Sequence, residues 1–311
     1  MSRRPPLRDA LGDYLSLRRA LGFKLHNAGR LLGQFVDYLE ARGIDTISTH
    51  DAFVWASLPD GASPHWRAIR LSAVRGFAGY LHTIDPTVEV PPTGLVRAGT
   101  SRATPYLYSP AEISSLLGAA AELGPPLRAA TYQGLIGLLW VSGLRIGEAI
   151  ALDDDDLDTG DDLLIVRDSK FDKSRLVPLH PSTTQALERY VDLRTRTCPR
   201  PTSPALLVSS RGTRLHHSNI SFTFATLLQQ VGIIRRSASC RPRIHDLRHS
   251  FATTTVLNCY RNGGDVAAML PRLATYLGHS DPKHTFWYLS AAPELMAIAG
   301  ERLDVYVESR P

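Results

Sequence analysis

One stretch of sequence without a hydrophobic repeat divides the chain into two parts. Residues 85–107 read DPTVEVPPTGLVRAGTSRATPYL, and their prolines, glycines and small polar residues interrupt both helical and strand periodicity. Directly afterwards, Ser109, Pro110 and Glu112 combine an N-cap serine, a proline at the first helical position and the glutamate of a capping box. We therefore expect two domains, 1–84 and 108–311, joined by an interdomain linker at 85–107.

The part before this linker has the pattern of a small helical bundle. Apolar residues between 32 and 39 and between 69 and 81 recur at the spacing i, i+3, i+4, which places them on one face of an amphipathic helix. We expect four helices within residues 1–84.

The part after the linker combines helices with a short hairpin. An apolar helix is expected to end at Gly143, which is suited to a left-handed stop. Two β-rich runs, Leu163–Val166 and Arg175–Leu179, flank a polar turn with Lys170 and Lys173 near its tip. Segments 217–232, 245–259, 271–280 and 292–307 have helical patterns. The predicted fold class is therefore mainly α with a small β-hairpin or sheet (α+β).

Composition excludes some classes of protein and favours a polyanionic partner. The net charge is +5, and residues 1–105 hold most of the excess, with 13 basic against 9 acidic side chains. The sequence has no run of about 18 apolar residues and no signal-peptide pattern, so we expect a cytoplasmic protein without a membrane partner. The three cysteines are far apart and form no CxxC pair, which argues against a disulfide framework or a zinc knuckle.

Five local patterns in a fixed order point to chemistry. They are SGLRIGEA, SKFDKSRLVPL, HDLRHSFAT, LGHSDPKHTFWY and the tyrosine that closes the last one. Alone, each has an ordinary interpretation: Arg145 could pair with Glu148 at a helix end, Lys170 could be a solvated turn residue, and Tyr288 could be a core aromatic. The order of all five along the chain is what carries information.

Together these patterns resemble the catalytic domain of the tyrosine recombinases, or phage integrases, over residues 108–311. Phrases such as RRALGFKL and TFWYLSAAPELM are similar to the integrases encoded by mobile elements. The resemblance assigns the catalytic positions to Arg145, Lys170, His245, Arg248, His279 and Tyr288, with Glu148 and His249 as supporting residues.

Elementary chemistry agrees with this assignment. A phosphodiester under attack gains negative charge on its non-bridging oxygens, and the planar guanidiniums of Arg145 and Arg248 can clamp those oxygens. A tyrosine hydroxyl, with a pKa of about 10, needs cations and a base such as His245 to become a nucleophile. The departing 5′-oxygen needs a proton, which the hairpin residue Lys170 could supply. His279 would hydrogen-bond the phosphate.

The resemblance also implies a reaction course and partners. Attack by Tyr288 would give a 3′-phosphotyrosine and a free 5′-hydroxyl, without any cofactor, metal ion or ATP. The partner would be double-stranded DNA at a specific recombination site, bound by a homotetramer assembled through the C-terminal helix 293–305, with or without partner recombinases. The N-terminal domain would be the family's helical core-binding (SAM-like) DNA-binding domain.

One alternative fails on chemistry and two remain open. His245 and His249 have the spacing of a zinc-binding helix, but Asp246 is shorter than the usual glutamate and Arg248 places a fixed positive charge beside the supposed cation, so we reject a zinc site. A type IB topoisomerase would share the chemistry but relax supercoils as a monomer. An accessory recombinase subunit would bind DNA without cutting it.

Overall fold

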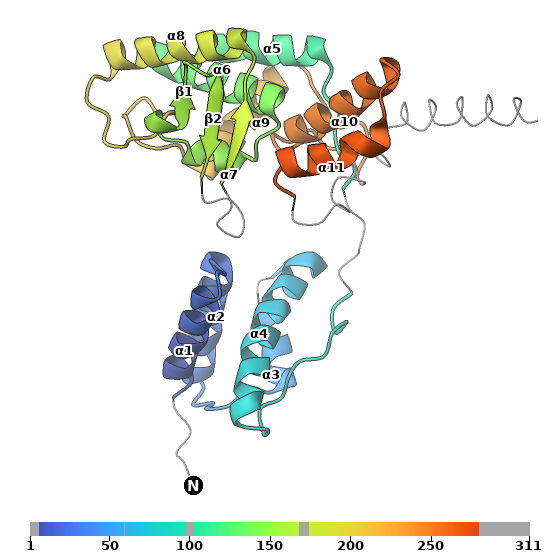
Figure 1. The fold of residues 1–311 in the computed structure, drawn as a ribbon. Coiled ribbons are helices and arrows are strands. Elements are labelled where there is room, and N and C mark those ends of the chain that lie inside the picture. Colours follow the sequence, from blue (N-terminus) through green and yellow to red (C-terminus); the bar gives the residue numbers. More distant parts are fainter. Residues whose placement is uncertain (1–5, 59, 98–102, 168–173, 280–311) are drawn as a thin grey trace, which may run out of the picture. The chain divides into compact units, whose positions relative to one another are not determined.

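The structure is a computed structural model that describes residues 6–58, 60–97, 103–167 and 174–279. The chain forms two compact units, Met1–Ser101 and Arg102–Pro311, shown in Figure 1. We call them the N-terminal unit and the C-terminal unit. The boundary between them lies inside the segment that the sequence predicts as a linker.

The described part of the N-terminal unit contains the four expected helices, α1 (Leu7–Ala20), α2 (His26–Glu40), α3 (Thr49–Ser57) and α4 (Pro64–Ile84). Serine side chains begin two of them: Ser48 accepts the backbone N–H of Asp51, and Ser63 accepts that of Trp66. The predicted apolar faces of α2 and α4 lie in one hydrophobic core, where Phe35 and Phe77 are fully buried. The helices are thus held together by their apolar stripes.

The first part of the predicted linker is bound to the N-terminal unit. The Arg75 guanidinium on α4 donates to the Pro91 and Pro92 carbonyls, at 2.7 and 2.8 Å. The Nδ1–H of His82 donates to the Val88 carbonyl at 2.7 Å, and Val88 is buried in the core. The lack of periodicity therefore marks an irregular segment that still packs on its domain.

The last part of the predicted linker is bound to the C-terminal unit. The ring of Tyr106 lies in the core of this unit, and the Leu107 carbonyl accepts a hydrogen bond from the Arg236 guanidinium at 3.1 Å. The capping box predicted at the next residues is present, with Ser109 and Glu112 each accepting the other's backbone N–H. It begins helix α5 (Pro110–Ala121).

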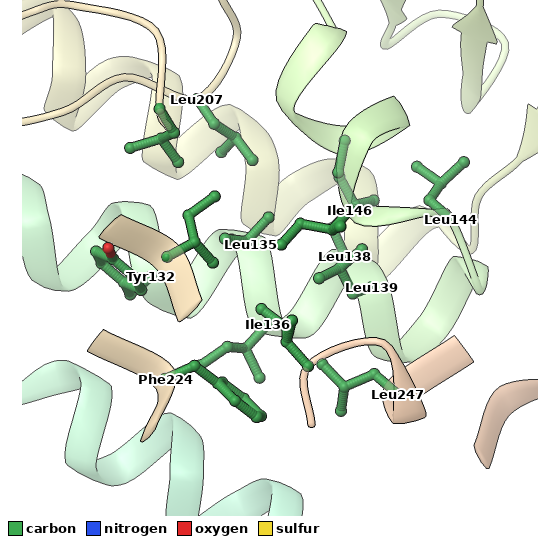
Figure 2. Close-up of a cluster of buried hydrophobic side chains, with 14 of the residues drawn as sticks. Tyr132, Leu135, Ile136, Leu138, Leu139, Leu144, Ile146, Leu207, Phe224 and Leu247 are labelled. Carbon is green, nitrogen blue, oxygen red and sulfur yellow. The ribbon is translucent and has the colours of Figure 1, made fainter. Parts of the chain in front are cut away.

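The core of the C-terminal unit surrounds α6 (Pro126–Ser142), which ends as predicted at Gly143 in the left-handed conformation. Figure 2 shows side chains of α6 packed together with Leu207, Phe224 and Leu247. These partners come from distant parts of the sequence, because α9 (His217–Gln230) and α10 (Asp246–Arg261) both contribute to this core. Helix α6 is thereby buried along most of its length.

A small antiparallel sheet stands beside the helices in the order β1-β2-β3. The predicted hairpin is confirmed: β2 (Leu163–Val166) pairs with β3 (Arg175–Pro178), and Leu164 lies opposite Val177, both buried. Strand β1 (Leu157–Asp158) joins the far edge of β2 and was not predicted. The turn 168–173, with Lys170 and Lys173, lies outside the described residues.

Two helices differ from the sequence prediction. Helix α8 (Pro181–Thr197) was not predicted at all. Helix α11 (Val266–Tyr276) begins five residues before the predicted start at Pro271, because the Asp265 side chain caps it by accepting the backbone N–H of Ala268. No helix within the described ranges is both long and apolar enough to cross a membrane.

Candidate active site

Arg145 occupies the turn between two helices of the C-terminal unit. It follows Gly143 at the end of α6 and is the N-cap residue of α7 (Ile146–Ala151). Its guanidinium donates to Glu148 Oε1 at 2.7 Å and to the Gly278 carbonyl at 2.9 Å. The side chain keeps 29 % of its surface exposed, so it remains accessible to a ligand.

Arg248 lies deeper, on the first turn of α10, with only 2 % of the side chain exposed. Its guanidinium donates to the carbonyls of Gly143 and Leu277, at 2.8 and 2.6 Å. It also donates to Nε2 of His279 at 3.0 Å. The carboxylate of Glu148 lies 4.0 Å from the same guanidinium, so Arg248 combines neutral acceptors with one nearby negative charge.

Glu148 accepts hydrogen bonds from two arginines and lies 4.0 Å from a third, Arg248. Its carboxylate accepts the Arg145 contacts and also two hydrogen bonds from Arg175, Oε1 from NH1 at 3.1 Å and Oε2 from NH2 at 2.8 Å. Burial alone would raise the pKa of Glu148, but the hydrogen bonds from Arg175 and Arg145 outweigh it and hold the pKa at about 2. The carboxylate is therefore ionised at neutral pH.

His245 is the N-cap residue of α10, and His249 lies one turn further along the helix. Their rings are nearly perpendicular, with the edge of one against the other and centroids 5.1 Å apart. His245 keeps much of its surface exposed, but partial removal from water and then the charge of Arg248 lower its pKa to about 4. Removal from water and the neighbouring His245 lower that of His249 to about 3. Both rings are therefore neutral at pH 7. In the described segments, no group of three or more His, Cys, Asp or Glu side chains is placed to hold a metal ion.

Two glycines supply carbonyls to the arginines from left-handed turns. Gly143 has φ +61° and its carbonyl accepts Arg248; Gly278 has φ +65° and its carbonyl accepts Arg145. A Cβ atom on Gly143 would lie 2.4 Å from the Phe251 ring. Both the conformation and the lack of space favour glycine at this position.

The structure thus brings together six of the eight candidate residues: Arg145, Glu148, His245, Arg248, His249 and His279. Lys170 and Tyr288 lie outside the described residues. Arg175 belongs to the pattern SKFDKSRLVPL but was not predicted to take part in the site. Three guanidiniums around one carboxylate leave excess positive charge, which suits an anion with several oxygen atoms.

Comparison with known proteins agrees with this chemistry. The model of the phage integrase family matches residues 108–294. A putative integrase/recombinase, y4rB, of Sinorhizobium fredii is 44% identical, covering 97% of this chain and 98% of the relative. The tyrosine recombinase XerC of Pseudomonas syringae is 31% identical, covering 83% of this chain and 82% of the relative. The Tn1549 transposon integrase, solved in complex with transposon right end DNA, has the same fold, with a TM-score of 0.64 at 19% identity, covering 95% of this chain and 99% of that one.

Proposed function

The chain belongs to the phage integrase family of tyrosine recombinases, and on this premise we propose that it is a site-specific recombinase. It cleaves and rejoins double-stranded DNA through a 3′-phosphotyrosine intermediate. Arg145, Arg248 and His279 come from three separate parts of the sequence and lie together at one site. This arrangement supports the recombinase function most directly.

The first step is nucleophilic attack on a DNA phosphodiester. Tyr288 Oη forms a bond to phosphorus while the bond from phosphorus to the 5′-oxygen breaks. Arg145 and Arg248 stabilise the negative charge that develops on the non-bridging oxygens. Arg248 is held in place before DNA arrives by its hydrogen bonds to two carbonyls, so little reorganisation is needed.

Two protons move in this step. The His245 ring can accept the proton of the Tyr288 hydroxyl, because it is neutral at pH 7 and one ring nitrogen carries a free lone pair. Lys170 gives a proton to the departing 5′-oxygen. The phosphotyrosine bond conserves the energy of the broken bond, so that a different 5′-hydroxyl can reverse the reaction and complete strand exchange.

The remaining parts of the chain serve DNA binding and assembly. The N-terminal unit holds most of the excess positive charge and contacts the duplex mainly through phosphates. Residues 293–305 dock on a neighbouring subunit and assemble a homotetramer on the recombination site. Strand exchange then proceeds in two successive steps through a four-way junction.

A nicked suicide substrate tests this proposal. Incubation of the whole chain with DNA that carries its recombination site should trap a covalent protein–DNA adduct, and excess EDTA should leave the yield unchanged. Adduct formation that stops on chelation would contradict the metal-free mechanism. Relaxation of supercoiled plasmid without a specific site would favour a type IB topoisomerase, and binding without an adduct would favour an accessory subunit.

A further inference from the structure

Arg175, the first residue of β3, connects three elements that border the candidate site. Its Nε donates to the Tyr276 carbonyl at the end of α11, at 2.8 Å. Its NH1 and NH2 donate to the two oxygens of Glu148 on α7. Only 13 % of the side chain is exposed, and each of its three nitrogens has a protein oxygen as acceptor.

These contacts hold both acceptors that orient Arg145. Glu148 Oε1 accepts NH1 of Arg145 at 2.7 Å and NH1 of Arg175 at 3.1 Å. A bidentate arginine fixes the plane of the carboxylate that it grips. Arg175 also holds the Tyr276 carbonyl, two residues before Gly278, whose own carbonyl accepts NH2 of Arg145 at 2.9 Å.

The turn at Gly278 closes tightly over the same two guanidiniums. Its φ is +65°, and a Cβ atom there would lie 3.0 Å from NH1 of Arg175 and 3.5 Å from NH1 of Arg145. The backbone thus approaches Arg175 as closely as a glycine allows. A displaced Arg175 side chain would release this turn as well as Glu148.

We propose that Arg175 is a positioning residue. It holds Glu148 and the Gly278 turn in place, and these two in turn orient Arg145 toward the scissile phosphate. The inference rests on the proposed function and adds a residue to its machinery. Arg175 acts through Arg145, because its own nitrogens are already engaged with protein oxygens. The resulting defect should therefore resemble the loss of Arg145.

A substrate with a methylphosphonate at the scissile position separates positioning from general stability. Its neutral phosphorus centre develops less negative charge during attack, so it depends less on the guanidinium clamp. Arg175→Ala should slow single-turnover cleavage of ordinary DNA by about tenfold or more, with nearly unchanged DNA affinity. The deficit relative to the wild type should shrink on the methylphosphonate strand, as it should for Arg145→Ala.

Arg194 on α8 provides a matched control. It also grips a carboxylate with two nitrogens, NH1 to Asp154 Oδ1 at 2.6 Å and NH2 to Oδ2 at 2.8 Å. Lysine cannot make a bidentate contact, so Arg175→Lys and Arg194→Lys each lose one such pair. Only the Arg175→Lys variant should show a cleavage deficit that depends on the substrate, whatever the two changes do to the melting temperature.

The double variant Arg145→Ala/Arg175→Ala completes the test. It should cleave ordinary DNA no more slowly than Arg145→Ala alone, because two residues that act as one unit are not additive. Equal deficits of the Arg175→Lys variant on both substrates, or additive effects in the double variant, would overturn the positioning role. A wild-type chain that forms no adduct would instead refute the proposed function.

Discussion

At the scale of single residues, the two histidines at the start of α10 have unusually low pKa values. The pKa values of His245 and His249 lie at about 4 and about 3, whereas an unfolded chain has its histidine pKa at about 6.5. Below that pH the unfolded state binds protons that the folded state does not, so acidification weakens folding. Glu148, with a pKa of about 2, stays ionised until the solution is much more acidic.

The less exposed His249 should therefore make stability depend on pH between about 6.5 and 3. Its contribution is complete well above pH 6.5 and falls by about 2 kcal/mol on acidification from pH 7.5 to pH 5. The variant His249→Gln removes that titration, so its melting temperature should fall less than the wild type's on the same acidification. An equal fall in both proteins would show that His249 titrates normally in the folded state.

Lys170 and Lys173 lie only three residues apart, and the proposed proton donor can be distinguished from its neighbour by chemistry. A substrate with sulfur in place of the bridging 5′-oxygen needs no proton, because a thiolate leaves readily. Lys170→Ala should be nearly inactive on ordinary DNA and largely restored on the sulfur-bridged strand. Lys173→Ala, the matched control, should be mildly impaired on both. Restoration of the Lys173 variant instead would reverse the assignment.

At the scale of secondary structure, the end of α6 places a carbonyl at the candidate site. The Gly143 carbonyl accepts Arg248, and Gly143 packs against Phe251 of the same helix α10. Gly143→Ala would strain a left-handed residue and drive a Cβ atom into the Phe251 ring, which together cost about 1–3 kcal/mol. Thermal unfolding should show this loss, and cleavage should slow as Arg248 shifts. Gly137→Ala, inside α6 with open space around its Cβ position, should instead raise stability by about 0.5–1 kcal/mol and leave cleavage unchanged.

How well each element could be predicted depends on how local its signal is. The capping box at Ser109 and the stop at Gly143 were predictable, because neighbouring residues determine them. Helix α8 was not, because its buried face includes the polar residues Thr184 and Arg194, which interrupt the apolar stripe. The role of Arg175 could not be predicted for a related reason, because its partners Glu148 and Tyr276 lie 27 and 101 residues away along the chain.

At the scale of the whole molecule, folding and assembly should be separable. Residues 293–305 are proposed to pack on a neighbouring subunit more than on their own core, so a chain that ends at Ser290 should keep the melting temperature of the full-length protein. It should lose cooperative assembly on DNA, because residues 293–305 are proposed to dock on a neighbouring subunit. A chain that ends at Val305 is the control. Complexes of unchanged stoichiometry and cooperativity from the shorter chain would contradict this role.

Tyr288 is the proposed nucleophile that joins the protein to DNA. Tyr288→Phe removes only the hydroxyl oxygen, and Tyr306→Phe makes the same change in another tyrosine near the C-terminus. With a nicked suicide substrate under denaturing electrophoresis, Tyr288→Phe should bind DNA with wild-type affinity and give no covalent adduct, while Tyr306→Phe should give the wild-type yield. A covalent adduct that persists in the Tyr288→Phe variant would contradict the account.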